Sequence, residues 1–169
     1  PIDAKSRKRR KIKQKQSTVV LDSVVYNIPF FEEKLYANGK LIEKHKVAVG
    51  SPLTPCLLGE YTVIKAERHR KKRCYIPARL IFIRKRGGWV YATHGTDEYF
   101  SIGLPFSTGC ARNLYESMLY IYKHHSKNTR FIFYYKPVKL INDSLLLIAP
   151  DFYNWDYIKE VIAVSYTHL

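Results

Sequence analysis

The chain has 169 residues, of which 29 are Lys or Arg and 14 are Asp or Glu, giving a net charge of +15. Hydrophobic residues make up 46% of it, which excludes a wholly disordered chain and fits one domain with a buried core. No apolar stretch is long enough to cross a bilayer, and no signal-peptide pattern is present. A membrane anchor or export signal would therefore lie outside this sequence.

The positive charge is concentrated at the N-terminus, where eight lysines and arginines fall within the first sixteen residues. Such a block repels itself, so we predict a basic arm over residues 1–17, a folded domain over 18–160 and an uninformative tail over 161–169. The arm could bind nucleic acid, anionic lipid or an anionic wall polymer. It contains no aromatic residue on which bases could stack, so we expect no nucleic-acid partner.

Short apolar runs bounded by Gly, Pro and Asn predict a β-rich fold. Asn38-Gly39 accepts positive φ at both central positions of a type I′ turn and predicts a hairpin. Gly87-Gly88 predicts a second hairpin. The expected strands lie, in chain order, at 18–26, 34–37, 41–49, 60–66, 80–83, 89–93, 131–135 and 145–149.

One helix is predicted after these central strands. Apolar residues recur at the helical period from Leu114 to Tyr122. Asn113 is the expected N-cap, and Glu116 three residues later completes a variant of the capping box. The helix is therefore expected to begin just after Cys110-Ala111-Arg112, with its apolar stripe packed on the core.

His94 and Cys110 are the one base and nucleophile pair framed by small residues. A cysteine attacks as the thiolate, and a neighbouring imidazole or helix N-terminus lowers its pKa. His94 ends a predicted strand. Cys110 follows Ser107, Thr108 and Gly109, whose small size lets backbone N–H groups approach a substrate carbonyl as an oxyanion hole.

The other cysteines carry no such frame. Cys56 and Cys74 each border a chain reversal, so they are a candidate disulfide in an exported protein, with two unpaired thiols as the alternative. No cysteine or histidine spacing matches a zinc site. We therefore expect no metal and no cofactor.

The region around Cys110 resembles the active-site signature of the L,D-transpeptidase catalytic-domain family, which reads HGT, then G-x-P, then S-H-G-C-x-R. The matching residues are His94-Gly95-Thr96, Gly103-Leu104-Pro105 and Ser107-Thr108-Gly109-Cys110-Ala111-Arg112. Weaker similarity to the family's opening hairpin, T-P-x-G segment and closing strands extends over residues 31–156. Thr108 departs from the family, because it stands where the signature has a histidine.

The resemblance implies a mainly β fold, an L,D-transpeptidase-like β-sandwich with one short helix following the catalytic cysteine. It implies a cysteine acyltransferase of the periplasm or extracytoplasmic cell envelope, with a peptidoglycan stem tetrapeptide as donor. Such enzymes release D-alanine, hold the donor as a thioester, and pass it to an amine acceptor in a 3→3 cross-link.

The resemblance also assigns roles to single residues. Cys110 becomes the nucleophile and His94 the base, with the Gly95 carbonyl orienting the imidazole. The backbone N–H groups of Gly109 and Cys110 become the oxyanion hole. The expected substrate-binding residues are Arg112, Tyr91, Ser107 and Thr108. Arg112 either holds a substrate carboxylate or braces the loop.

Two alternatives stay open. An L,D-carboxypeptidase would use the same acyl-enzyme and resolve it with water instead of an amine. A non-catalytic basic β-domain would bind nucleic acid or a wall polymer. The acceptor is a diaminopimelate side chain, a protein lysine or water, and no oligomeric state is predicted.

Overall fold

The computed structural model describes residues 19–70, 75–84, 86–142, 145–149 and 152–153. The predicted arm, the predicted tail and Cys74 lie outside the described residues. The described strands are β1 (Ser23–Asn27), β2 (Glu32–Ala37), β3 (Lys40–Gly50), β4 (Gly59–Tyr61), β5 (Lys65–Arg68), β6 (Ala78–Arg84), β7 (Val90–Gly95), β8 (Pro105–Ser107), β9 (Ala111–Asn113), β10 (Arg130–Tyr134), β11 (Val138–Asn142) and β12 (Leu145–Ile148). The described helices are α1 (Tyr115–His124) and the short 3-10 helices η1 (Ile28–Phe30), η3 (Arg86–Gly88) and η4 (Tyr99–Ser101).

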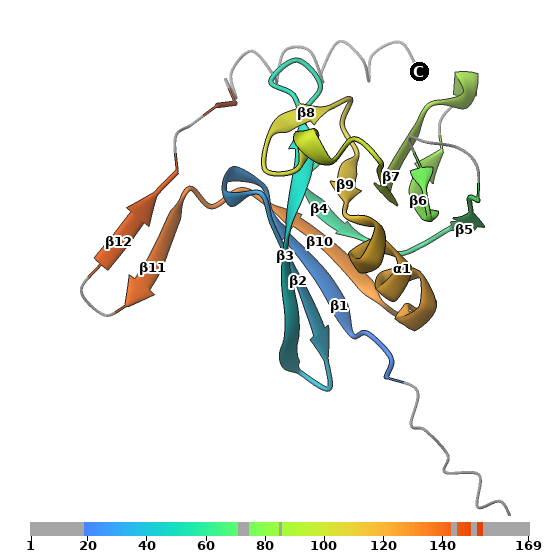
Figure 1. Cartoon of the computed structure of the whole chain (residues 1–169), viewed down its shortest axis with the longest axis horizontal. Coiled ribbons are helices and arrows are strands. Elements are labelled where there is room, and N and C mark those ends of the chain that lie inside the picture. The colour runs from blue at the N-terminus through green and yellow to red at the C-terminus, as the bar shows by residue number, and fades with distance from the viewer. Residues whose placement is uncertain (1–18, 71–74, 85, 143–144, 150–151, 154–169) are drawn as a thin grey trace, which may run out of the picture.

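Ten strands form one sheet in the order β4-β10-β1-β2-β3-β9-β7-β6-β5, with β8 paired to β3. Only residues 62–64 separate β4 from β5 in the chain, although these strands lie at opposite ends of the sheet order. The sheet therefore curls until its ends approach each other, and α1 packs against β6 and β7 (Figure 1). The predicted mainly β fold with one short helix is confirmed.

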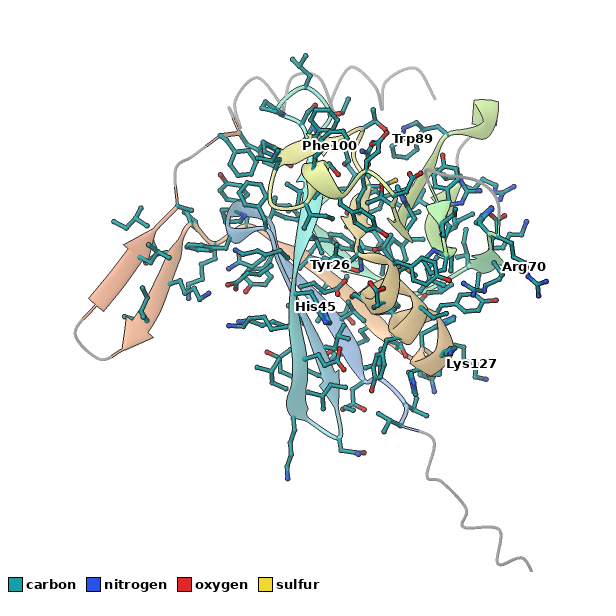
Figure 2. All side chains as sticks on the ribbon, in the orientation of Figure 1. Tyr26, His45, Arg70, Trp89, Phe100 and Lys127 are labelled. Atoms are coloured by element: carbon teal, nitrogen blue, oxygen red, sulfur yellow. The ribbon has the colours of Figure 1, made fainter. Side chains whose placement is uncertain are left out.

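The interior of the curled sheet is filled by aromatic side chains. The Tyr61 ring of β4 lies 5.8 Å from Phe82 of β6, 5.3 Å from Tyr91 of β7 and 5.9 Å from Phe133 of β10. Tyr26 stacks on Phe133 at 4.3 Å and is fully buried in the middle of the molecule (Figure 2). Because each such ring buries a large apolar area, this cluster holds the two ends of the sheet together.

The hairpin predicted at Asn38-Gly39 is confirmed, since β2 and β3 pair antiparallel and φ is 50° at Asn38 and 69° at Gly39. The predicted helix is also confirmed, but its start is different. Leu114 is the N-cap residue, and β9 lies between Cys110 and the helix. Cys110 is therefore not at a helix N-terminus, and no helix dipole acts on its thiol.

Asn113 has another task than the predicted cap, because it binds a buried carboxylate. Glu33 of β2 is fully buried and accepts hydrogen bonds from Asn113 Nδ2, from Ser117 Oγ at 2.6 Å and from His45 Nδ1 at 3.2 Å. The hydrogen bond to Glu33 raises the pKa of His45. Asn113 Oδ1 in turn accepts the Thr93 hydroxyl at 3.1 Å. One carboxylate thus joins β2, β3, β9 and α1, and reaches β7 through Asn113.

Gly95 closes β7 where the chain entering β6 packs against it. A Cβ atom at Gly95 would lie 1.9 Å from the Ile76 carbonyl oxygen and 2.6 Å from Pro77 Cδ. No side chain fits in that space. A glycine at this position therefore allows the two strands to approach, next to His94.

The β11–β12 hairpin stands apart from the main sheet (Figure 1). Lys139 ties it back through an ion pair with Glu32. After the hairpin the chain returns to the domain, where Phe152 stacks on Phe31 at 5.3 Å and Tyr153 on Tyr135 at 5.5 Å. Among the described residues, no helix is long and apolar enough to span a membrane.

We predict that Glu33→Ala lowers the free energy of unfolding by about 3 kcal/mol, because two buried donors lose their acceptor. Glu43→Ala is the matched control, since Glu43 is half-exposed and also contacts His45, at 3.2 Å. An exposed pair is worth about 1 kcal/mol or less. Denaturant unfolding of both variants compares them directly, and equal losses would contradict a central role for Glu33.

We predict that Gly95→Ala lowers the free energy of unfolding by about 3 kcal/mol or more, because a backbone carbonyl must move to admit the methyl group. Gly103→Ala is the control. Its Cβ would meet no atom within 4 Å, and only its φ of +85° disfavours a side chain, at a cost of about 1–2 kcal/mol. Thermal unfolding of the two variants measures the difference, and a Gly95→Ala protein as stable as Gly103→Ala would refute the close approach.

Candidate active site

The pairing of β7 with its neighbours brings the predicted residues together. β7 and β9 are parallel with His94 opposite Arg112, and β6 and β7 are antiparallel with Arg79 opposite His94. Cys110 immediately precedes β9 and lines the same cavity as Arg112. The register therefore places Cys110, the nucleophile candidate, two residues before the partner of His94, the base candidate.

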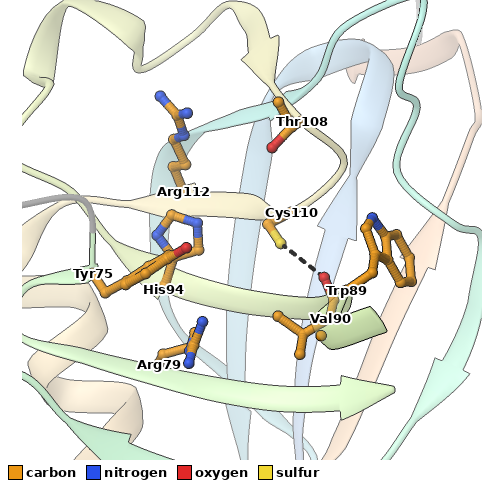
Figure 3. Close-up of a pocket in the computed structure, with 9 residues that line it drawn as sticks. Tyr75, Arg79, Trp89, Val90, His94, Thr108, Cys110 and Arg112 are labelled. Carbon is orange, nitrogen blue, oxygen red and sulfur yellow. Dashed lines mark hydrogen bonds between the residues drawn. The ribbon is translucent and has the colours of Figure 1, made fainter. Parts of the chain in front are cut away.

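These residues border a cavity of about 270 Å³. Cys110 and His94 both line it, with Thr108 and Arg112 on one wall and Trp89 on the other (Figure 3). The complete lining is Tyr75, Arg79, Gly88, Trp89, Val90, His94, Thr108, Cys110 and Arg112. Over the described residues, no group of three His, Cys, Asp or Glu side chains could hold a metal ion.

The His94 imidazole is held in one orientation by its neighbour in the chain. Nδ1 donates to the Gly95 carbonyl at 2.9 Å, which leaves the Nε2 lone pair free to accept a proton. Burial lowers the pKa of His94 to about 4. The charges of Arg112, Arg79 and His69 lower it further, and the hydrogen bond to Gly95 has the opposite effect. His94 is therefore a neutral base at physiological pH.

Cys110 is a thiol in the resting structure. Its Sγ donates to the Val90 carbonyl at 3.8 Å, and burial raises the pKa of the thiol. Over the described residues, no hydrogen bond joins it to His94. The expectation that a neighbouring imidazole lowers the pKa of Cys110 is therefore wrong for the resting site. A neutral His94 carries no charge that would stabilise a thiolate.

The loop that carries Cys110 is fixed by Ser107. The Ser107 hydroxyl donates to the Cys110 carbonyl at 2.5 Å and accepts the Gly109 N–H at 3.2 Å. Gly109 has a φ of +108°, a conformation that glycine adopts without strain. Ser107 is buried and lies outside the cavity lining, so in this structure its side chain braces the loop. Its contact with substrate stays a prediction. The predicted oxyanion donor Gly109 N–H is already bonded.

A second loop, residues 50–56, packs against the loop that carries Cys110. The Thr54 hydroxyl donates to the Ser107 carbonyl at 3.1 Å. The Tyr153 hydroxyl donates to the Gly50 carbonyl at 2.6 Å, and the Gly50 N–H bonds Cys56 Sγ at 3.2 Å. Cys56 is a free buried thiol, and burial raises its pKa to about 12. Its role in the described structure is packing under the active-site loop.

Arg112 braces the cavity wall, one of its two predicted roles. Its Nη1 bonds the Glu98 carboxylate at 2.5 Å, and its guanidinium lies 6.0 Å from the centre of the Phe106 ring. Thr108 is exposed and lines the cavity, and its contact with substrate stays a prediction. The prediction that Tyr91 lines it is wrong. Tyr91 is fully buried in the aromatic core, and its neighbour Val90 faces the cavity instead.

The sequence analysis missed three large lining residues, Tyr75, Arg79 and Trp89. Trp89 begins the predicted strand 89–93, directly after Gly87-Gly88, and its 43% exposure is unusual for so large a ring. A tryptophan directly after a predicted turn, at the start of the strand that ends at His94, is a signal that sequence reasoning could have used. Tyr75 and Arg79 carry no comparable signal. Arg79 meets His94 only through the β6–β7 register, and Tyr75 reaches the imidazole from the chain that precedes β6.

No protein-family model matches the sequence, and no curated protein matches it. Solved structures do match: an L,D-transpeptidase from Mycobacterium tuberculosis H37Rv at 17% identity and TM-score 0.57, one from Mycobacterium smegmatis at 18% and 0.54, and the catalytic domain of the E. faecium enzyme at 17% and 0.54. These alignments cover 69%, 68% and 67% of this chain. They span 58% and 59% of the two mycobacterial chains but 96% of the E. faecium domain. The chain therefore has the fold of an L,D-transpeptidase catalytic domain.

Proposed function

We propose that this protein is a cysteine L,D-transpeptidase that acts on peptidoglycan stem peptides. The observation that carries the proposal is the joint placement of Cys110 and His94 on one cavity, in the fold of these enzymes. His94 donates from Nδ1 to the Gly95 carbonyl and burial keeps the imidazole neutral, so Nε2 is available to accept a proton. Catalytic hydrogen bonds in free enzymes are often long and shorten when substrate binds.

In the proposed acylation, His94 Nε2 takes the Cys110 proton as Sγ attacks the carbonyl carbon at the L-centre of diaminopimelate. The Cys110 N–H is the proposed oxyanion donor, because the Gly109 N–H is bonded to Ser107. One such donor is worth about 2.7–4 kcal/mol. The bond to D-alanine then breaks, its nitrogen takes the proton from Nε2, and a thioester remains on Cys110.

In the proposed second step, an amine acceptor attacks the thioester carbon and His94 Nε2 accepts the proton of the amine. The carbon–sulfur bond breaks, and the proton returns to Cys110. The product is a 3→3 cross-link. A peptidoglycan substrate places this step in the extracytoplasmic cell envelope.

The cavity suits a donor that carries a carboxylate. Arg112 lies on its wall, and guanidinium groups bind carboxylates well. Solved relatives of the same fold include one with a faropenem-derived adduct and one in complex with imipenem. Such β-lactams are therefore the first probes to use on this chain.

An L,D-carboxypeptidase is the second candidate. The exposed Thr108 leaves the cavity open beside Cys110, so water can reach the thioester there. Incubating the protein with a stem tetrapeptide, with and without excess amine acceptor, separates the two reactions by their products.

We predict that imipenem adds one covalent equivalent to the protein and that Cys110→Ala abolishes the adduct, as read by intact-protein mass spectrometry. His94→Gln should slow the addition by about 10²–10⁴-fold, the usual share of a positioned base. Cys56→Ala is the matched control and should keep the adduct, since that thiol is buried. An adduct that survives Cys110→Ala would overturn the assignment.

We predict that Thr108→His changes the rate of acylation by less than about threefold. Threonine has no group that titrates near neutrality, and His94 already supplies the base. The substitution should instead change the ratio of transfer to hydrolysis, because residue 108 lies beside the thioester. Stopped-flow acylation and product analysis measure the two effects. Rescue by orders of magnitude would instead identify a disabled enzyme.

A further inference from the structure

A row of charged side chains crosses the sheet through His94. Glu67 of β5 lies opposite Arg79 of β6, Arg79 opposite His94 of β7, and His94 opposite Arg112 of β9. Each arginine is held on its outer side by a carboxylate. Glu67 accepts Arg79 Nε at 3.0 Å and Nη2 at 2.5 Å. Arg112 bonds Glu98.

Tyr75, which precedes β6, is a further neighbour of this row. The Tyr75 ring lies edge-on to the His94 imidazole, with centroids 4.9 Å apart and planes at 88°. The Arg79 guanidinium lies over the same ring at 4.4 Å. Tyr75 is thus held between a cation that cannot move freely and the imidazole that must be oriented (Figure 3).

We propose that Tyr75 and Arg79 are positioning residues for His94. Glu67 fixes Arg79, Arg79 fixes the Tyr75 ring, and the ring keeps the imidazole on the Gly95 carbonyl with Nε2 free toward the cavity. Neither residue touches the reacting atoms in this role. The inference deepens the proposed function, because it rests on His94 as the base.

Arg79 does not have the geometry of a simple substrate anchor. Two of its three guanidinium nitrogens are bound to Glu67, and its face is covered by Tyr75. Glu67 also accepts Lys65 at 2.9 Å, and the bonds from Lys65 and Arg79 lower the pKa of Glu67 to about 2. The carboxylate is therefore charged throughout the working pH range, and it holds Arg79 in place.

The groups that face His94 predict the sign of the effect. They are Tyr75 and Arg79 from the β6 side, Arg112 and Cys110 from the β9 side, and His69 beyond the end of β5. Removing the Tyr75 ring admits water to the imidazole, and removing Arg79 takes away a positive charge. Both changes favour the imidazolium, so both raise the pKa of His94. Protonated His94 cannot accept the thiol proton, so the acid limb of acylation moves to higher pH.

The test measures the tautomer and the pKa of His94 in the free protein by ¹⁵N NMR. The signals that disappear in the His94→Gln spectrum are assigned to His94. The unaltered protein should show one Nδ1–H tautomer at pH 7. Tyr75→Leu should show mixed tautomers and a pKa that moves from about 4 toward the ordinary 6.5, and Arg79→Gln should move it less in the same direction. Tyr75→Phe should restore the unaltered spectrum. Tyr99→Ala is the control, an exposed ring that does not line the cavity.

Imipenem acylation then gives the catalytic readout, with an expected loss of about 10–10²-fold at pH 6 in Tyr75→Leu and recovery in Tyr75→Phe. An unchanged tautomer and pKa in both Tyr75→Leu and Arg79→Gln would overturn the inference, even in an active enzyme. If Cys110 is never acylated, the proposed function fails, but the NMR result still decides the positioning role. If Tyr75→Leu does not fold, the Arg79→Gln spectrum decides it.

Discussion

The parallel register between β7 and β9 is the constraint on which the candidate site depends. It places His94 opposite Arg112 and leaves Cys110 two residues earlier, on the same cavity. A slip of one residue would turn these side chains into the core. The buried Glu33 carboxylate guards against that slip from the opposite face, because Asn113 of β9 bonds both Glu33 and the Thr93 hydroxyl of β7. The active face and the buried polar network therefore occupy alternate residues of the same two strands.

The electrostatics of the candidate site keep its two central side chains, His94 and Cys110, uncharged. His94 is neutral and Cys110 is protonated, both chiefly because of burial. Since the thiolate is the form that oxidants attack, a protonated Cys110 resists oxidation in the resting site. Arg79 and Arg112 beside them each pair with a carboxylate, Glu67 and Glu98. These ion pairs reduce the repulsion between the two arginines that line the cavity.

Features encoded by neighbouring residues could be predicted from sequence. The hairpin at Asn38-Gly39 was predicted because both residues tolerate positive φ, and the helix was predicted from the apolar periodicity over 114–122. β8 and β9 were missed because three-residue strands show no alternation. Tyr91 was placed on the wrong face because alternation gives two faces without saying which one is buried. The low thiolate character of Cys110 and the place of Arg79 depend on burial and cross-strand pairing, which no local pattern records.

Tyr153 shows that the working unit of this fold extends past its recognisable motif. It follows a hairpin that stands apart from the sheet, yet its hydroxyl bonds the Gly50 carbonyl in the loop that supports the nucleophile. A fragment ending at Tyr135 would retain all nine lining residues of the cavity. It would nevertheless lose Tyr153, whose ring stacks on Tyr135 and whose hydroxyl bonds the Gly50 carbonyl. The smallest fragment that keeps the candidate site intact is therefore set by the chain that returns after the hairpin, and a fragment designed from the sequence motif alone would be too short.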